Sequence, residues 1–371
     1  MLELDERFEI LFIPNLGDGV QQQITKLISN SPEGLNLVEK EVPHIETAIS
    51  LLKQGHGDIV AVSGRWWFEN RDLDLSANLV LPRREPTRVL VGENKPEYIP
   101  KKGIIIVDCE LVRRQFNRFR SDLKIMMAEE FVDAPSDEIE KVFWLEKLRD
   151  NGEIDGYVTT RSLYSMLDSK VRRHTLGLQK GNEERSRFIP QPLEGYTVLV
   201  TRPDFPSSKF APVIDVGASL SFRLEMTMLD NIPENLHNKI GLFVEQRKLG
   251  ALLREANKIG DDFALKEISL NQKNFSENKN RIELLLELLN KDGSVTASVD
   301  RVFSVEESHS GLINALKDWT QIIEVLMESP GQEKRGRIKE IMNQYIETMI
   351  QENRISEENV NNPKLNNEDL E

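Results

Sequence analysis

A pair of arginines stands where an apolar run of the sequence gives way to a predicted helix. Arg113 and Arg114 lie in the opening of a predicted helix that directly follows the apolar run at 104–108. The first N–H groups of a helix and its positive end already favour anions at such a place. A guanidinium group adds a planar fork of donors that matches a carboxylate or a phosphate. The pattern therefore predicts an anion site, and a solvated, charged face is the alternative.

Further arginines stand beside other predicted strands. Arg65 follows the apolar run at 58–64. A second strand junction is flanked by Arg83, Arg84 and Arg88. In an open α/β sheet, ligands lie in the crevice outside the carboxyl ends of the strands. We therefore expect these guanidinium groups to converge on a cleft that binds an anionic small molecule.

The histidines, the glycine-rich turn and the cysteine of this sequence give little evidence of a functional site. The five histidines have no metal-ligand spacing, so we expect no metal site. The turn Gly17-Asp18-Gly19 follows the first predicted strand, but it lacks the pattern of a phosphate-binding loop, and a simple turn is favoured. Cys109 is the only cysteine of the chain, so it cannot form an internal disulfide. A small residue at a strand end is favoured there over a reactive thiol.

The composition indicates an ordinary globular protein. Hydrophobic residues make up 39% of the 371 residues and charged residues 30%, which excludes a disordered or fibrous chain. The net charge of −14 disfavours nucleic acid and anionic membranes as partners. No apolar run reaches the roughly 18–20 residues that span a bilayer, and no signal-peptide pattern is visible. We therefore expect a cytoplasmic protein without membrane or nucleic-acid contacts.

The charge is unevenly distributed along the chain. Residues 65–120 hold twelve basic and eight acidic residues, a net charge of +4. Residues 351–371 hold six acidic and two basic residues, a net charge of −4. A locally basic stretch in an acidic protein suits a small polyanion better than it suits nucleic acid.

The first half of the chain alternates predicted strands with predicted helices. Continuous apolar runs at 8–14, 58–64 and 104–108 predict strands that are buried on both faces. The segment 44–55 predicts an amphipathic helix, and Ser136 is the expected N-cap of another. Such an alternation is typical of mostly parallel sheets covered by helices.

The second half changes character and predicts an α+β module. The segment 218–229 alternates in part between apolar and polar residues, and 240–260 predicts one long amphipathic helix. The Asn-Lys-Asp-Gly turn at 290–293 lies between two apolar runs and predicts a hairpin. A further helix is expected at 308–328.

A strand pattern that returns at 197–203 predicts a chain that leaves its first domain and comes back. We therefore expect five parts: domain one at 1–90 with 188–205, domain two at 91–187, domain three at 206–330, a helical extension at 331–352 and a disordered acidic tail at 353–371. The apolar residues of 332–350 recur at helical spacing. They would fold back onto the molecule, dock on a protein partner or mediate self-association.

Several segments, in their order along the chain, resemble the hydroxymethylbilane synthase (porphobilinogen deaminase) family. Its DIAVHSMKD strand is similar to DIVAVSGRW at 58–66, and its R-E-D-P-R-D-A hinge strand to RREPTRVLV at 83–91. Its G-T-S-S-L-R-R-Q helix start is similar to IVDCELVRRQFNRFRSDLKI at 106–125, and its L-x-x-G-E-Y-D segment to LRDNGEIDGYV at 148–158. The resemblance spans most of residues 8–328.

The resemblance implies two periplasmic-binding-protein-like α/β domains, linked by hinge strands, and a small third domain. This agrees with the pattern of elements, so we expect an α/β fold with an α+β third domain and a C-terminal helical extension. It also implies an enzyme of tetrapyrrole (porphyrin) biosynthesis, a transferase that condenses four porphobilinogens. The family uses a catalytic aspartate and a dipyrromethane cofactor bonded to a cysteine.

The chain departs from the family at both of those positions. Trp66 stands where the catalytic aspartate is expected, and a tryptophan cannot transfer protons. Ala256 stands near the position of the cofactor cysteine, so the usual dipyrromethane thioether is not expected. The catalytic residues are therefore unknown. The matching positions leave five residues for binding the substrate or another anion: Ser63, Arg65, Arg88, Arg113 and Arg114.

Two hypotheses of function follow from the resemblance, and a third does not depend on it. The first is a divergent enzyme of the hydroxymethylbilane synthase type. The second is a non-catalytic descendant, a possible pseudoenzyme, that binds an anionic small molecule (a tetrapyrrole or its precursor) or a protein partner in the interdomain cleft. The third is an unrelated pair of periplasmic-binding-protein-like domains that acts as a sensor.

Overall fold

The computed structural model describes residues 7–167, 171–178, 187–260, 265 and 279–327. The predicted helical extension at 331–352 and the tail at 353–371 lie outside these residues. By its internal contacts the chain divides into two compact units. The larger comprises residues 1–248 with 280–315, and the smaller comprises 249–279 with 316–371. Among the described helices, none is long and apolar enough to cross a membrane.

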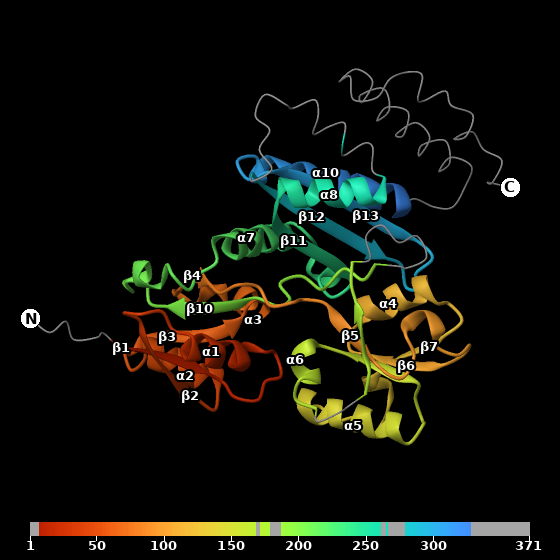
Figure 1. Cartoon of the computed structure of the whole chain (residues 1–371), viewed down its shortest axis with the longest axis horizontal. Coiled ribbons are helices and arrows are strands. Elements are labelled where there is room, and N and C mark those ends of the chain that lie inside the picture. Colours follow the sequence, from red (N-terminus) through yellow and green to blue (C-terminus); the bar gives the residue numbers. More distant parts are fainter. Residues whose placement is uncertain (1–6, 168–170, 179–186, 261–264, 266–278, 328–371) are drawn as a thin grey trace, which may run out of the picture. The chain divides into compact units, whose positions relative to one another are not determined.

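The larger unit begins with a five-stranded sheet, which we call the first lobe (Figure 1). Its strands, in spatial order, are β2 (Asn36–Glu41), β1 (Arg7–Phe12), β3 (Ile59–Ser63), β10 (Thr197–Thr201) and β4 (Ser76–Val80). β1 pairs with β2 and β3 in parallel, whereas β10 runs antiparallel to β3 and β4. The strand that returns late in the chain is thus inserted between two early strands.

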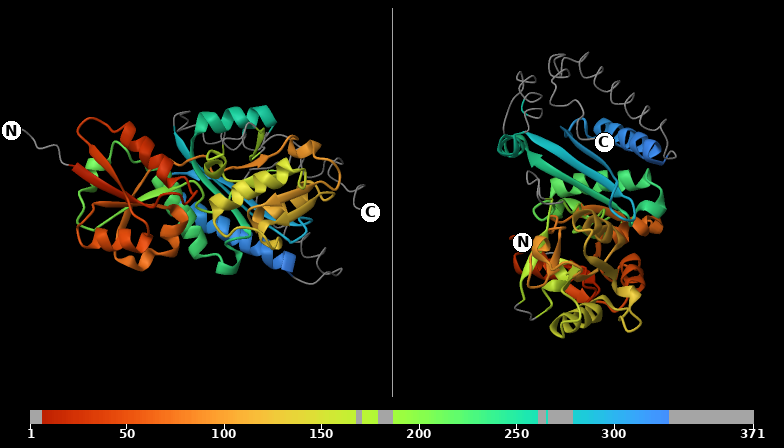
Figure 2. Two further views of the ribbon diagram at one scale, coloured as in Figure 1. Left: turned by 90° about the horizontal axis from the view of Figure 1, so that it is seen from below. Right: turned by 90° about the vertical axis from the view of Figure 1, so that its right-hand side faces the viewer.

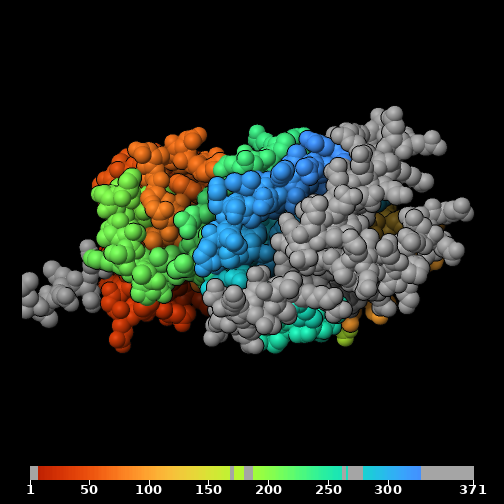
Figure 3. Space-filling model, turned by 90° about the horizontal axis from the view of Figure 1, so that it is seen from above, coloured from red at the N-terminus to blue at the C-terminus, as the bar shows by residue number. Residues whose placement is uncertain are grey.

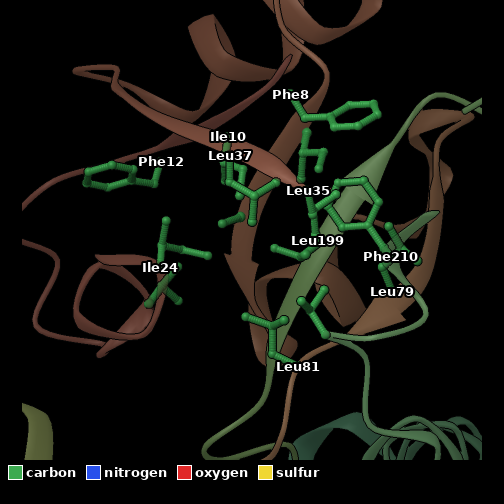
Figure 4. Packing of buried hydrophobic residues seen from close by; sticks show 14 of the residues in the cluster. Phe8, Ile10, Phe12, Ile24, Leu35, Leu37, Leu79, Leu81, Leu199 and Phe210 are labelled. Atoms are coloured by element: carbon green, nitrogen blue, oxygen red, sulfur yellow. The ribbon is translucent and has the colours of Figure 1, made fainter. Parts of the chain in front are cut away.

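Burial on both faces explains why continuous apolar runs form these strands. The helices α1 (Val20–Ser29), α2 (Ile45–Lys53) and α3 (Gly64–Glu69) follow β1, β2 and β3 in turn. The core cluster in Figure 4 includes Ile10, Leu37, Leu79 and Leu199 from four strands, with Ile24 of α1. A fully buried side chain of this kind stabilises the fold by about 1.5–3 kcal/mol.

A second five-stranded sheet, the second lobe, repeats the same strand order. Its strands, in spatial order, are β7 (Lys124–Met127), β6 (Ile104–Val107), β8 (Gly156–Thr159), β5 (Arg88–Val91) and β9 (Arg173–Leu176). β6 is parallel to β7 and β8, and β5 is antiparallel to both of its neighbours. In each lobe, therefore, one antiparallel strand adjoins a chain segment that crosses between the lobes.

The helices of the second lobe begin at capped positions. They are α4 (Glu110–Phe119), α5 (Glu138–Asp150) and α6 (Arg161–Tyr164). The N-cap of α5 is Asp137 rather than the expected Ser136, because the Asp137 carboxylate accepts the backbone N–H groups of Ile139 and Glu140. The prediction was displaced by one residue, since both residue types are good N-caps.

The third sheet is antiparallel and consists of β11 (Ile240–Lys248), β12 (Asn280–Leu289) and β13 (Thr296–Ser304) (Figure 2). The predicted hairpin at 290–293 joins β12 to β13. The prediction of one helix over 240–260 was wrong in its first half. β11 forms nine residue pairs with β12 before α8 (Leu249–Ile259) begins. An apolar run such as IGLFV fits either period, and pairing with an equally apolar strand decided it.

The partly alternating segment 218–229 lies in a helix, α7 (Val216–Asp230). Its N-cap Asp215 accepts the backbone N–H of Ala218 at 2.8 Å, and Phe222 and Leu229 are buried. In the space-filling view, the green surface that follows β10 lies against the red and orange surface of the first lobe (Figure 3). The last described helix is α10 (Ser308–Met327), close to the predicted 308–328.

The chain is therefore an α/β protein with two periplasmic-binding-protein-like domains, hinge segments between them and a small α+β part. The first crossing (81–87) runs from β4 to β5, and the second crossing (187–196) runs towards β10. The crossings are hydrogen-bonded to each other: the backbone N–H of Arg84 donates to the carbonyl of Gly195 at 3.0 Å. Gly195 has a φ of 83°, and a Cβ there would lie 2.5 Å from the Arg84 carbonyl oxygen.

Candidate functional site

A pocket of about 210 Å³ lies where the two crossings meet both lobes. Its walls are Gly19 and Gln22 at the start of α1, residues 84–88 of the first crossing and β5, residues 160–162 with Ser165 of the second lobe, and residues 194–195 of the second crossing. A water molecule occupies about 30 Å³ of liquid, so the pocket has room for roughly seven groups of that size. It therefore suits a small ligand.

Arg84 is a partly buried arginine of this pocket whose hydrogen bonds, among the described residues, all go to uncharged groups. Its Nε donates to the side-chain oxygen of Gln23 at 3.0 Å, and its Nη1 donates to the backbone carbonyl of Asp18 at 2.5 Å and to the Ser162 hydroxyl at 3.3 Å. In the described part of the chain, no carboxylate forms an ion pair with it. Burial lowers the pKa of Arg84, although Asp18 and Glu194 act against that effect. An uncompensated guanidinium of this kind favours an anion beside it.

Arg161 is the second arginine of the pocket that is held by neutral groups. It opens α6 directly after β8, where the Thr160 hydroxyl caps the helix by accepting the N–H of Leu163 at 3.2 Å. The Arg161 guanidinium donates to the hydroxyls of Thr87, at 3.3 and 3.4 Å, and Thr175, at 2.9 Å. Among the described residues, no carboxylate therefore forms an ion pair with Arg161.

Arg88, in contrast, is already neutralised. It is buried, with 8% of its side chain exposed, and its Nε donates to the Asp108 carboxylate at 2.6 Å. Its Nη2 donates to Gln191 at 2.8 Å and lies 3.7 Å from Glu194. Arg88 thus links the second lobe to the second crossing, and carboxylates of the protein itself largely neutralise its charge.

The loop before α1 touches the second lobe beside the pocket. Gly19 has a φ of 81°, and a Cβ there would collide with the Arg84 guanidinium and the Ser162 hydroxyl. A Cβ at Gly17 would likewise collide with the side chain of Leu163 in α6. The two lobes are therefore in contact around the pocket, and glycine is required where they meet.

The other arginines predicted to bind an anion lie outside the pocket. Arg113 pairs with Glu110 at 2.8 Å and with Glu130 at 3.1 Å. Arg114 pairs with the same Glu110 at 2.7 Å and donates to the backbone carbonyl of Leu289 in β12. Their guanidinium groups are thus engaged by acids of the protein itself.

The structure also disperses the candidates around β3. Ser63 caps α3, its hydroxyl accepting the N–H of Trp66 at 3.3 Å. Arg65 pairs with Glu69 at 3.1 Å and also donates to Asn238. None of these residues lines the pocket described above. Of the five predicted anion-binding residues, only Arg88 does so.

Ala256 and Cys109 have no role in this pocket. Ala256 is a buried residue of α8. Cys109 precedes α4, and burial raises the pKa of its thiol to about 12. No group of three or more potential metal ligands of the His, Cys, Asp and Glu types occurs in the described part of the chain.

The sequence did contain a signal for Arg161 that was missed. The segment Val158-Thr159-Thr160-Arg161-Ser162 places an arginine among hydroxyl side chains at the carboxyl end of a buried strand. This is the edge at which open α/β sheets bind ligands. Arg84 was noticed at a strand junction, but only the fold shows that its charge lacks a partner.

The chain has distant likenesses among known proteins. No family model and no curated protein matches it. An ABC transporter structure from Parabacteroides distasonis is 15% identical, with a TM-score of 0.35, over 55% of this chain and 68% of that one. The aliphatic sulphonate binding protein SsuA of Escherichia coli is 15% identical, with a TM-score of 0.29, over 69% and 75%. A ligand-binding component of an ABC-type import system from Staphylococcus aureus is 12% identical, with a TM-score of 0.32, over 89% and 95%.

The assignment to the hydroxymethylbilane synthase family was wrong. Neither a family model nor a curated member supports it, and the solved structures named above are transport and ligand-binding proteins. At such low identities and TM-scores, the solved structures say nothing about what this chain binds. The function must be argued from the pocket.

Proposed function

We propose that this protein binds a small molecule through an anionic group, a carboxylate, sulfonate or phosphate, in the pocket between the two crossings. The observation that carries the proposal is Arg84, a partly buried guanidinium whose hydrogen bonds within the described residues all go to uncharged oxygens. Removing a charge from water costs several kcal/mol unless a partner of opposite charge offsets that cost. A bound anion is that partner.

The surroundings of Arg84 support the same conclusion. Its Nη2 and the Nη1 of Arg161 have no hydrogen-bond partner among the described residues, so each arginine retains a donor for a ligand. The hydroxyls of Thr87 and Ser162 line the same pocket, as does Gln22 at the start of α1. Charge-assisted hydrogen bonds are roughly twice as strong as neutral ones, so the two arginines would supply most of the affinity.

The pocket favours binding over catalysis. Its lining includes neither histidine nor cysteine, the residue types that most often serve as general base and activated nucleophile. Its contact with both lobes and both crossings would instead let a ligand hold the lobes together. Hinged two-lobed folds close around a ligand in this way when they bind it.

A thermal-unfolding titration tests the proposal. The full chain is titrated with sodium sulfate against sodium chloride at constant ionic strength. We expect the unfolding midpoint to rise with sulfate and, above the Kd, to keep rising with the logarithm of its concentration, because a ligand at ten times its Kd stabilises the native state by about 1.4 kcal/mol. Arg84→Gln and Arg161→Gln should abolish this rise.

Arg113→Gln is the matched control, because this arginine is paired with acids outside the pocket. It should retain the sulfate response of the wild-type protein. The proposal is wrong if both pocket variants respond like the wild type, or if Arg113→Gln alone loses the response.

A further inference from the structure

The same pocket contains the carboxylate of Glu194, whose charge is as poorly paired as that of Arg84. The Glu194 side chain is 30% exposed, and its nearest cation is Arg88, at 3.7 Å. Arg88 has two closer partners, Asp108 at 2.6 Å and Gln191 at 2.8 Å. No described residue donates a hydrogen bond to the Glu194 carboxylate. It therefore offers free acceptor positions at the pocket wall.

The orientation of Glu194 is fixed by its backbone. Its carbonyl accepts the Nε of Arg83 at 2.9 Å. The N–H of the preceding residue, Leu193, donates to the buried carboxylate of Glu225 at 2.7 Å. Leu193 has a φ of 62°, a conformation that few residues other than glycine adopt. The second crossing is thus held in an unusual conformation that presents Glu194 at the pocket.

The charges around the pocket are mixed rather than positive. The lining has the three arginines Arg84, Arg88 and Arg161 with Glu85 and Glu194; outside the lining, Asp108 pairs with Arg88, and Asp18 attracts Arg84. Glu85 accepts a hydrogen bond from the Thr87 hydroxyl at 2.8 Å, whereas Glu194 has none. A ligand with only a negative charge would pair with the free arginines and leave the free carboxylate beside it uncompensated.

From this arrangement we infer that the ligand is a small zwitterion, whose acidic group pairs with Arg84 and Arg161 and whose ammonium group pairs with Glu194. The inference rests on the proposed function and names the class of its ligand. The pocket volume of about 210 Å³ suits a molecule of the size of a small amino acid or aminosulfonate.

The test compares probes that differ only in the amino group. Calorimetric titration of the full chain uses two pairs, ethanesulfonate with taurine and acetate with glycine. A hydrogen bond to a charged group is worth a factor of about ten or more in affinity. The wild-type protein should therefore bind at least one amino compound about tenfold or more tightly than its partner.

Glu194→Gln is the deciding variant, because it keeps the shape of the side chain and no described hydrogen bond depends on its carboxylate. It should bind the amino and non-amino probes about equally, with the affinity for the plain anion unchanged or higher. Glu130→Gln is the matched control, because this carboxylate lies outside the pocket and pairs with Arg113 at 3.1 Å; it should keep the preference. The unfolding midpoint without ligand verifies that both variants fold.

The outcomes separate this inference from the proposed function. If plain anions bind and depend on Arg84, but amino compounds bind no better, only the zwitterion is excluded. A preference that survives Glu194→Gln excludes Glu194 as its cause. If no probe binds to the wild-type protein, the proposed function itself is overturned.

Discussion

The same substitution at two adjacent arginines of the first crossing should cost several kcal/mol of stability at one of them and little at the other. The Arg83 guanidinium is stacked on the ring of Tyr196, 4.1 Å from its centroid, and donates to the Glu225 carboxylate at 2.8 Å. Glu225 is fully buried, so Arg83→Gln would leave a buried carboxylate without its cation. Breaking such a pair costs about 3–5 kcal/mol.

Arg84→Gln should lower the free energy of unfolding by no more than about 1 kcal/mol, because the hydrogen bonds lost with this side chain are offset by removal of a buried, unpaired charge. Of the three acceptors, the side chains of Gln23 and Ser162 are only partly buried and can turn to water. The same variant should lose the ligand-induced stabilisation.

The assay is urea unfolding of both variants beside the wild type, followed by circular dichroism in the absence of added anions. Arg83→Gln should lower the free energy of unfolding by about 3–5 kcal/mol. Arg84→Gln should stay near the wild type. If Arg84→Gln costs as much as Arg83→Gln, the Arg84 charge is compensated within the protein and the reasoning behind the pocket fails.

Three further predictions concern other parts of the larger unit. Gly19→Ala should destabilise the loop before α1 and abolish the sulfate response, because a Cβ would collide with Arg84 and the φ of 81° is unfavourable for alanine. Thermal titration measures both the stability and the sulfate response. An unchanged sulfate response would contradict the contact between this loop and Arg84. Glu287→Ala should lower the free energy of unfolding by about 3–5 kcal/mol, because this fully buried carboxylate binds Arg118 at 2.9 Å; a loss below about 1 kcal/mol in urea unfolding would refute that. Cys109 should react with iodoacetamide at pH 8 about a thousandfold more slowly than a free thiol, because burial raises its pKa to about 12 from 9.0 and the thiolate is the nucleophile. Since the unfolded thiol ionises first, stability should fall as the pH rises from about 9 towards 12, and Cys109→Ala should remove part of that fall.

The strands that pack on both faces could be predicted from the sequence, because their burial leaves a continuous apolar run. This holds for β3 and β6, whereas the hairpin of β12 and β13 was predicted from its turn at 290–293, and β13 is exposed at several positions. The start of β11 could not, because its apolar run fits a helix equally well and only the pairing with β12 makes it a strand.

The candidate site was predicted less well, for two physical reasons. Arg113 and Arg114 looked free, yet Glu110 stands three and four residues before them and pairs with both along the helix. That signal was present in the sequence. Arg84 of the first crossing and Arg161 at the start of α6 are 77 positions apart in the sequence, and no local pattern shows that they converge.

The location of a bound anion tests the central claim most directly. A crystal structure of the full chain with sodium selenate, an analogue of sulfate, would show the anion by its anomalous scattering. If Arg84 and Arg161 bind the anion, selenate oxygens should lie within about 2.7–3.2 Å of their guanidinium groups. Selenate bound at Arg113 or Arg114, with none in the pocket, would contradict this claim.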